Sequence, residues 1–220
     1  MKKSINLYLV LWMISSSVNV NAANYDKGWI VNLDGEKLEG LIKTFYSTDK
    51  NIEFKKNKKD KSIKFKSSEL KEIGLVIEKN QDTLLFEKVK SSRYAFFGNK
   101  VKFDDDLFWS IKAYGSDKIE GYYFIVEEGN SMPMGNGGRV NRVSLSRLIG
   151  VRYPGAEHVL LLSQDSGASD PFHAYDKLLR KGFIKMIEEK CPNMVKMIEE
   201  KKYNVEDFVK LLEDYTASCN

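Results

Sequence analysis

The chain is poor in the side chains on which most catalytic and metal sites depend. It has two histidines and two cysteines in 220 residues. It also lacks a Gly-x-Ser-x-Gly elbow, which exposes a nucleophilic serine, and a Walker loop, which cradles phosphates. These absences predict no catalytic residue, no metal ligand and no bound cofactor, and they favour a protein that is not an enzyme.

The two histidines have plain structural interpretations. His158 stands at the edge of an apolar strand pattern, so we expect a half-buried side chain. Asp170, His173 and Asp176 are spaced i, i+3, i+6, but three ligands in this arrangement converge poorly on a metal ion. We interpret them as a helix cap followed by first-turn charges.

Three further segments resemble known sites, and each lacks an essential part. Gln164–Gly167 is similar to the nucleophile turn of trypsin-like proteases, but no His-Asp pair stands at a suitable place upstream, so we interpret it as a linker. Gly135–Arg139 has the glycines of a phosphate loop without a following helix, and we predict a hairpin tip. Asp104–Asp106 carries ligands that suit Ca²⁺, but consecutive residues cannot all point inward, which favours a solvated strand entry.

Long uncharged hydrophobic runs are absent after the first residues. Lys2 and Lys3 precede the apolar core Ile5–Ile14, and Ser15–Ala22 is small and polar, as in a signal peptide cleaved after Ala22. The apolar core is too short for a bilayer, which needs about 20 residues. We therefore expect residues 1–22 to be removed, with no transmembrane segment remaining. The predicted location is the periplasm, the outer membrane surface or the exterior of a Gram-negative bacterium.

The chain also has little net charge, +4 before processing. The signal peptide carries two of the lysines and no acid, so the mature chain is closer still to neutral. An exported and almost neutral protein is unsuited to a nucleic acid partner. We expect the partner to be an unknown envelope component or protein; the oligomeric state is not indicated.

One segment, Lys55–Lys66, is nevertheless strongly basic. The favoured interpretation is that its lysines protect an exposed hairpin edge from pairing with other chains. The alternative is contact with lipopolysaccharide or another anionic envelope polymer. The residues for that contact would be Lys55, Lys56, Lys58, Lys59, Lys61 and Lys64.

Both cysteines, Cys191 and Cys219, lie near the C-terminus. An even number of cysteines in an oxidising compartment predicts a disulfide. Closing a loop of this size stabilises the folded state by about 3–4 kcal/mol in the chain-entropy model. We therefore predict a structural Cys191–Cys219 bridge.

The segment Gly28–Tyr46 indicates how the first part of the chain folds. Two alternating apolar patterns flank Asp34-Gly35, a strong signal for a β-hairpin. Trp29, Val31 and Leu33 fall on one face of the first strand. Gly40 in the second strand predicts a bulge or a sharp bend, as small barrels use.

Short apolar patterns continue to about Gln164 and predict a mainly antiparallel β body over residues 23–165. The expected strands are Asn51–Lys55, Ser62–Lys66, Ile73–Ile77, Thr83–Phe86, Tyr94–Phe97, Leu107–Ala113, Ile119–Val126, Ile149–Tyr153 and His158–Leu162. The motif Lys37–Gly40 is echoed at Lys118–Gly121, so sub-units 24–100 and 101–165 from a duplication remain an open alternative.

After a polar linker, residues 170–220 change to helical spacing. Asp170-Pro171 is a good helix start, and Gly182 could divide the first helix in two. Pro192 opens a second helix, and Asn204 with Asp207 caps a third. The predicted fold class is therefore α+β: a small SH3-like barrel or bent sheets followed by a C-terminal helical segment.

Two resemblances add to this interpretation. The order of the first strands is similar to that of SH3-like barrels of the Sm kind, a likeness of topology over about fifty residues. The chain also resembles an uncharacterised family of secreted or periplasmic Gram-negative proteins. The residues that carry this second resemblance are Gly28–Ile42, Cys191-Pro192, Ile198-Glu199, Tyr215 and Cys219. That family implies location and architecture, and no reaction.

The hypothesis that agrees best with these observations is a non-enzymatic binding or accessory module of the envelope. A hydrolase acting on envelope polymers is the first alternative, and it would need a cleft with two carboxylates about 5–10 Å apart. Binding of anionic envelope surfaces through Lys55–Lys66 is the second.

Overall fold

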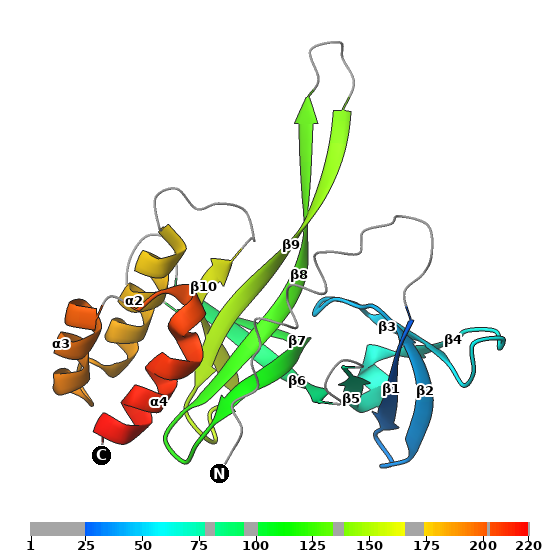
Figure 1. The fold of residues 1–220 in the computed structure, drawn as a ribbon, viewed down its shortest axis with the longest axis horizontal. Coiled ribbons are helices and arrows are strands. Elements are labelled where there is room, and N and C mark those ends of the chain that lie inside the picture. The colour runs from blue at the N-terminus through cyan, green and yellow to red at the C-terminus, as the bar shows by residue number, and fades with distance from the viewer. Residues whose placement is uncertain are drawn as a thin grey trace. The chain divides into compact units, whose positions relative to one another are not determined.

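The computed structural model describes residues 25–77, 82–94, 101–133, 139–165, 174–201 and 203–219. The predicted signal peptide, the tip of the Gly135–Arg139 segment and the predicted helix start at Asp170-Pro171 lie outside these residues. The chain is α+β, as predicted, with a mainly antiparallel β body and a C-terminal helical segment (Figure 1). It divides into two compact units, one of residues up to Phe45 with Asp49–Glu87, the other of Tyr46–Thr48 with Lys88 onward.

The first unit is an antiparallel sheet in the order β6-β5-β1-β2-β3-β4. Its elements are β1 (Tyr25–Asn32), β2 (Lys37–Lys43), β3 (Asn51–Lys55), β4 (Ile63–Lys66), the 3-10 helix η1 (Ser67–Glu69), β5 (Leu70–Val76) and the start of β6 (Thr83–Tyr94). The core of the unit is aliphatic and aromatic: Ile30, Ile42, Ile52, Phe54, Leu70 and Ile73.

The predicted hairpin between β1 and β2 is confirmed, and the structure refines its turn. The Gly35 N–H donates to the Asn32 carbonyl at 3.1 Å, so Leu33 and Asp34 hold the two central positions. Gly35 follows at φ +86°, a conformation that glycine adopts without a Cβ clash. The predicted face of Trp29, Val31 and Leu33 is the outer face, since Leu33 is 65% exposed and Ile30 is buried.

Of the bulge or sharp bend expected at Gly40, the bulge is absent from the β1–β2 ladder. β2 keeps its register with β1 through Gly40, which lies opposite Gly28. The glycine is required because the chain packs closely at this point. A Cβ on Gly40 would lie 2.3 Å from the Lys55 carbonyl oxygen and 2.5 Å from the Phe54 ring.

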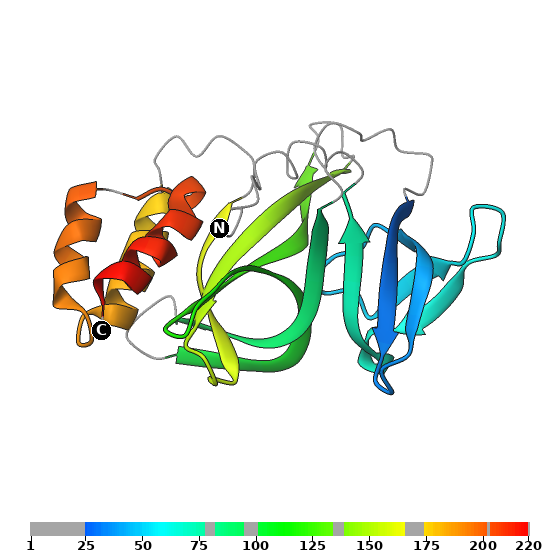
Figure 2. The same cartoon turned by 60° about the horizontal axis from the view of Figure 1, so that its bottom comes forward.

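The second unit is a closed β-barrel. The strand order is β6-β7-β8-β9-β10, and β10 returns to pair with β6 in parallel, from His158 opposite Lys90 to Leu161 opposite Arg93. The strong curvature of these strands is visible in Figure 2. The additional strands are β7 (Val101–Gly115), β8 (Glu120–Pro133), β9 (Arg139–Arg152) and β10 (His158–Asp165).

Several of these strands are longer than predicted. β6 begins at Thr83 and continues without interruption to Tyr94, whereas we expected one strand to end at Phe86 and another to begin at Tyr94. β9 begins at Arg139, where we expected a loop. The long β8–β9 hairpin in Figure 1 owes its length to a continuous ladder that pairs Pro133 with Arg139.

Three helices follow and cover one side of this barrel: α2 (Ala174–Ile187), α3 (Pro192–Lys201) and, after the 3-10 turn η2 (Val205–Asp207), α4 (Phe208–Ser218). The predicted break at Gly182 is wrong. α2 runs through Gly182, which is buried against Leu162 of β10. The absence of a side chain lets the helix approach the strand closely. No helix in the described part of the chain is long and apolar enough to span a membrane.

The predicted disulfide is confirmed. Cys191 and Cys219 are bonded, with their Cα atoms 5.6 Å apart. The bond joins the start of α3 to the end of α4. The predicted cap of the last helical segment is also present, because the Asn204 N–H donates to Asp207 Oδ2 at 3.1 Å.

Candidate functional site

The interior of the barrel changes in polarity along its strands. Inward positions of β8 are Tyr122, Phe124 and Val126, of which the first two are buried in the barrel core with Val89 and Val159. On β6 the alternate positions after Val89 are Ser91 and Arg93. Because side chains alternate along a strand, the inward positions of β6 change from apolar to polar along its length.

At this polar end the barrel contains a cavity of about 300 Å³. Its apolar wall continues the barrel core, and its other lining residues are polar or charged. The lining consists of Phe108, Phe124, Val126, Leu148 and Leu161 together with Thr48, Ser91, Ser92, Arg93, Lys102, Phe103 and Asp104. Phe124, Ser91 and Ser92 are buried, whereas Arg93, Lys102 and Phe103 are exposed. The cavity therefore has a closed floor and an exposed rim.

The cavity forms where the seam between β7 and β8 opens. The described pairs of this ladder end at Ile111 opposite Tyr123. Beyond them Ser47 lies between the strands, where it donates its N–H to the Ile125 carbonyl at 2.7 Å and accepts from the Trp109 N–H at 3.0 Å. The Ser47 hydroxyl also accepts the Ile125 N–H at 2.9 Å. The inserted segment Tyr46–Thr48 thus provides hydrogen-bond partners for the backbone groups of the open seam, and it brings Thr48 to the rim.

The charges at the rim are two cations and one anion. Within the part of the chain that the structure describes, neither Arg93 nor Lys102 forms an ion pair. The carboxylate of Asp104 is turned back along its own strand, since its Oδ1 accepts the Asp106 N–H at 3.1 Å. The rim therefore favours an anionic group over a cationic one.

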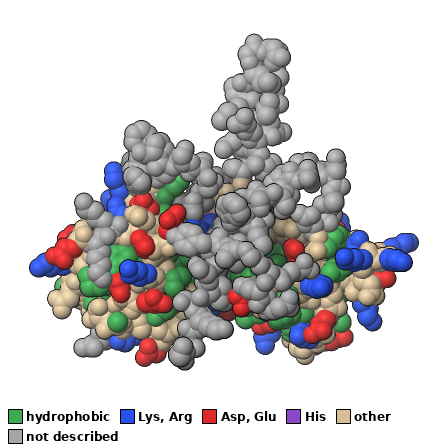
Figure 3. All heavy atoms as spheres, viewed as in Figure 1, with side chains coloured by type: hydrophobic (Ala, Val, Ile, Leu, Met, Phe, Trp, Pro, Cys, Tyr) green, Lys and Arg blue, Asp and Glu red, His purple; other side chains and the backbone are tan. Residues whose placement is uncertain are grey.

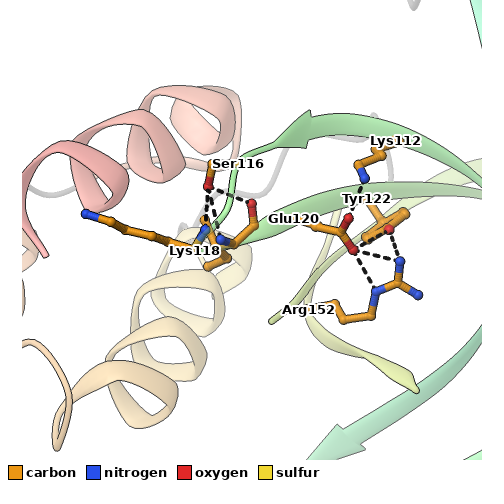
Figure 4. Close-up of polar contacts among 7 residues, drawn as sticks. Lys112, Ser116, Lys118, Glu120, Tyr122 and Arg152 are labelled. Carbon is orange, nitrogen blue, oxygen red and sulfur yellow. Dashed lines mark hydrogen bonds and ion pairs between the residues drawn. The ribbon is translucent and has the colours of Figure 1, made fainter. Parts of the chain in front are cut away.

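An ionic cluster surrounds Glu120 at the start of β8 (Figure 4). Glu120 accepts hydrogen bonds from Arg152 Nε at 2.8 Å and from the Tyr122 hydroxyl at 2.9 Å, and it pairs with Lys112. Burial alone raises the pKa of Glu120, but the hydrogen bonds from Lys112, Arg152 and Tyr122 outweigh it and hold that pKa below its usual value. Glu120 is consequently an ionised structural anchor.

Next to this cluster, the turn between β7 and β8 holds the last helix (Figure 4). The Lys118 ammonium donates to the Thr216 carbonyl at 3.0 Å and to the Cys219 carbonyl. A cation at a helix C-terminus is favourable because the last carbonyls are unpaired and partially negative. Phe208 packs edge-on against Tyr123 of β8, with ring centres 5.4 Å apart. These contacts fix the helical segment to the barrel.

No protein-family model, curated protein or solved structure matches this chain. The site must therefore be interpreted from its own geometry.

The described histidine and acidic candidates contact neighbouring side chains. The His158 side chain is half-buried at the start of β10, as predicted, and lies 3.4 Å from Asp105. Asp105 also pairs with Lys90 at 3.4 Å, and the His158 and Lys90 contacts lower its pKa. No cluster of three or more metal-ligating side chains occurs among the described residues. His173 and Asp170 lie outside them.

The Lys55–Lys66 segment forms the β3–β4 hairpin and its turn, as its alternation predicts. Lysine side chains gather at this end of the first unit in Figure 3. Lys64 lies 3.9 Å from Glu53, and Lys55 lies over the Tyr25 ring at 4.5 Å. Lys66 pairs with Glu69 at 3.8 Å. The other lysines of the segment are exposed, and none forms an ion pair with a described residue: Lys56, Lys58, Lys59 and Lys61.

Sequence reasoning did not find the barrel cavity. Its lining comes from five strands and one inserted segment that are distant in the chain. One local signal was available, the polar sequence Ser91-Ser92-Arg93 at the end of an apolar strand pattern. A strand that becomes polar on its inward face indicates an open end of a barrel.

Proposed function

We propose that this chain is an exported, non-enzymatic binding module of the bacterial envelope and that the cavity at the barrel mouth is its binding site. The observation that carries the proposal is the cavity of about 300 Å³, whose apolar floor is followed by a polar rim. Sites for small molecules have this construction, in which apolar walls supply affinity and a few polar groups supply orientation. The volume is at the small end of the usual range of roughly 300–1,000 Å³.

The proposed export is supported by the disulfide. A Cys191–Cys219 bond persists in an oxidising compartment and is rare in the bacterial cytosol. Together with the apolar N-terminal segment, it favours the periplasm or a location beyond it.

The hydrolase alternative receives no support from the described carboxyl groups. A general acid needs a raised pKa, and each described Asp or Glu with a resolved shift has a lowered one. These residues are Glu39, Glu53, Asp105, Glu120 and Glu157. Only Asp104 supplies a carboxyl group among the lining residues of the cavity, where a glycosidase-type reaction needs a pair.

The test is the capture of small molecules by the purified mature protein. Wild-type protein incubated with extract of its own envelope should retain a compound that mass spectrometry detects after washing and denaturation. Val126→Trp places a large side chain in the cavity at a half-buried strand position and should abolish retention. Leu178→Trp adds the same side chain at an exposed site on α2 and should retain the compound. Equal retention by both variants would contradict the proposal.

A second candidate function is binding of anionic envelope polymers through the β3–β4 hairpin. The supporting observation is the group of exposed lysines without ion partners among the described residues. Their nearest acid in the segment, Asp60, accepts a hydrogen bond from Asn57 at 2.9 Å.

This candidate predicts retention on immobilised lipopolysaccharide that weakens as salt increases, because released counterions and screening govern such contacts. Replacement of Lys56, Lys58, Lys59 and Lys61 by Ser should remove the retention. A control with Lys177, Lys181, Lys196 and Lys210 changed to Ser removes the same charge from the helices. Loss of retention to the same extent in both variants would indicate an effect of net charge alone.

A further inference from the structure

We infer that the barrel cavity binds an organic anion that carries one apolar group of about ten non-hydrogen atoms. This inference rests on the proposed function, because it names the class of ligand for the same site. Three properties of the cavity support it: the volume, the order of the lining and the charges of the rim.

The volume sets the size of the ligand. A cavity of about 300 Å³ corresponds to roughly ten times the volume of one water molecule, about 30 Å³ each in the liquid. An apolar group of about ten carbon atoms therefore fills it. A folded peptide, an oligosaccharide or a two-chain lipid is too large to enter completely.

The order of the lining sets the orientation. Phe108, Phe124, Leu148 and Leu161 belong to the apolar cluster of the barrel and form the floor. Ser91, at the next inward position of β6, is buried but polar, and its neighbour Ser92 is also a buried lining residue of the cavity. The Ser92 hydroxyl is 3.5 Å from its carbonyl partner on Val159, a long and weak hydrogen bond. The apolar end of a ligand therefore points inward, and a polar end meets the polar part of the lining.

The rim sets the charge. Arg93 and Lys102 are exposed lining residues, and neither is held by an ion pair with a described residue. Asp104 is the opposing charge, and its carboxylate is engaged by the backbone of its own strand. An anionic head group meets two available cations, whereas a cationic head group meets one partly engaged carboxylate.

Phe103 extends the apolar surface to the outside. Its side chain is 67% exposed and lines the cavity, and its ring lies 5.1 Å from that of His158.

The experiment uses straight-chain carboxylates from hexanoate to tetradecanoate, each below its micelle concentration, with calorimetry on the mature protein. The dissociation constant should fall about fourfold for each added methylene, the effect of transferring that group from water. The fall should stop near ten carbon atoms, when the cavity is full. A dissociation constant that does not change with chain length would overturn the inference.

Two sets of variants test the site and the charge. Val126→Trp should abolish binding of all the acids, and Leu178→Trp should leave it unchanged. The double variant Arg93→Gln, Lys102→Gln should bind the acids several-fold more weakly, with a loss of up to about fivefold in affinity for each exposed charge. Its affinity for alcohols of the same chain length should be unchanged. Lys210→Gln, on the exposed face of α4, is the control. Equal weakening of acids and alcohols would contradict the role of the rim.

The outcomes separate this inference from the proposed function. If no acid binds while the wild-type protein still captures an envelope compound that Val126→Trp does not, the site stands and the ligand class is wrong. Anionic lipid vesicles present the same combination, an apolar chain with an anionic head group, in a membrane. Retention on phosphatidylglycerol vesicles that Val126→Trp abolishes, without binding of the monomeric acids, would overturn the inference in favour of a membrane-held chain.

Discussion

Glu120 joins three neighbouring strands of the barrel. Its side chain is 14% exposed. It binds Lys112 of β7, the Tyr122 hydroxyl of β8 and Arg152 of β9. Its partner Arg152 also lies over the Tyr122 ring at 4.9 Å. The sequence does not indicate this cluster, because the three strands meet only when the barrel forms.

Glu120→Gln should destabilise the protein by about 2 kcal/mol at pH 7, the usual cost of losing hydrogen bonds to a charged group. Because folding lowers the pKa of Glu120, its contribution is complete above roughly pH 5 and is lost as the pH falls through the folded-state pKa. Urea unfolding should therefore show a difference between variant and wild type that shrinks below pH 4. Glu213→Gln, at an exposed position of α4, is the matched control. A difference that does not depend on pH would contradict this role.

At the scale of elements, α4 is held to the barrel by side-chain packing along the helix and by bonds at its C-terminal end. Gly121 of β8 allows Leu212 to approach so closely that a Cβ would lie 2.3 Å from it. Lys118 binds the last carbonyls of the helix, and Cys219 joins it to the start of α3. The amphipathic spacing predicted the buried face of the helix, and the strand that it covers became known from the structure.

The disulfide contribution can be measured with the double variant Cys191→Ser, Cys219→Ser. It should be less stable than wild type by about 3–4 kcal/mol, because the unfolded chain regains the freedom of the closed loop. As a control, the urea unfolding of both wild type and the double variant is measured with and without reductant. Reductant should lower the stability of wild type to that of the variant and leave the variant unchanged. Thiol titration of the unfolded wild type without reductant should detect no free cysteine.

At the scale of the whole molecule, two β units share one chain. β6 belongs to both, with Thr83–Glu87 in the first unit and Lys88–Tyr94 in the second. The motif Lys37–Gly40 is the start of β2, whereas Lys118–Gly121 leads into β8, and the origin of the units by duplication remains a prediction. The second unit contains the cavity and the helices, so the proposed binding function belongs to it.

Export is the prediction that applies to the whole chain. Cell fractionation should place the protein outside the cytoplasm, and sequencing of its mature N-terminus should begin at Ala23. Leu9→Glu interrupts the apolar core of the signal and should leave an uncleaved precursor in the cytoplasm. Ser4→Thr, outside the apolar core, should be exported normally. A wild-type protein that keeps its first residues and stays in the cytoplasm would contradict the proposed location.

Sequence alone was sufficient for the features that depend on neighbours along the chain. Alternation predicted most of the strands, Asp34-Gly35 predicted the first hairpin, and the even pair of cysteines predicted the disulfide. The tertiary structure decided where β7 and β8 separate, which face of β1 is buried and how β10 closes on β6. These properties depend on packing between distant strands, and the cavity lies where that packing leaves the barrel open.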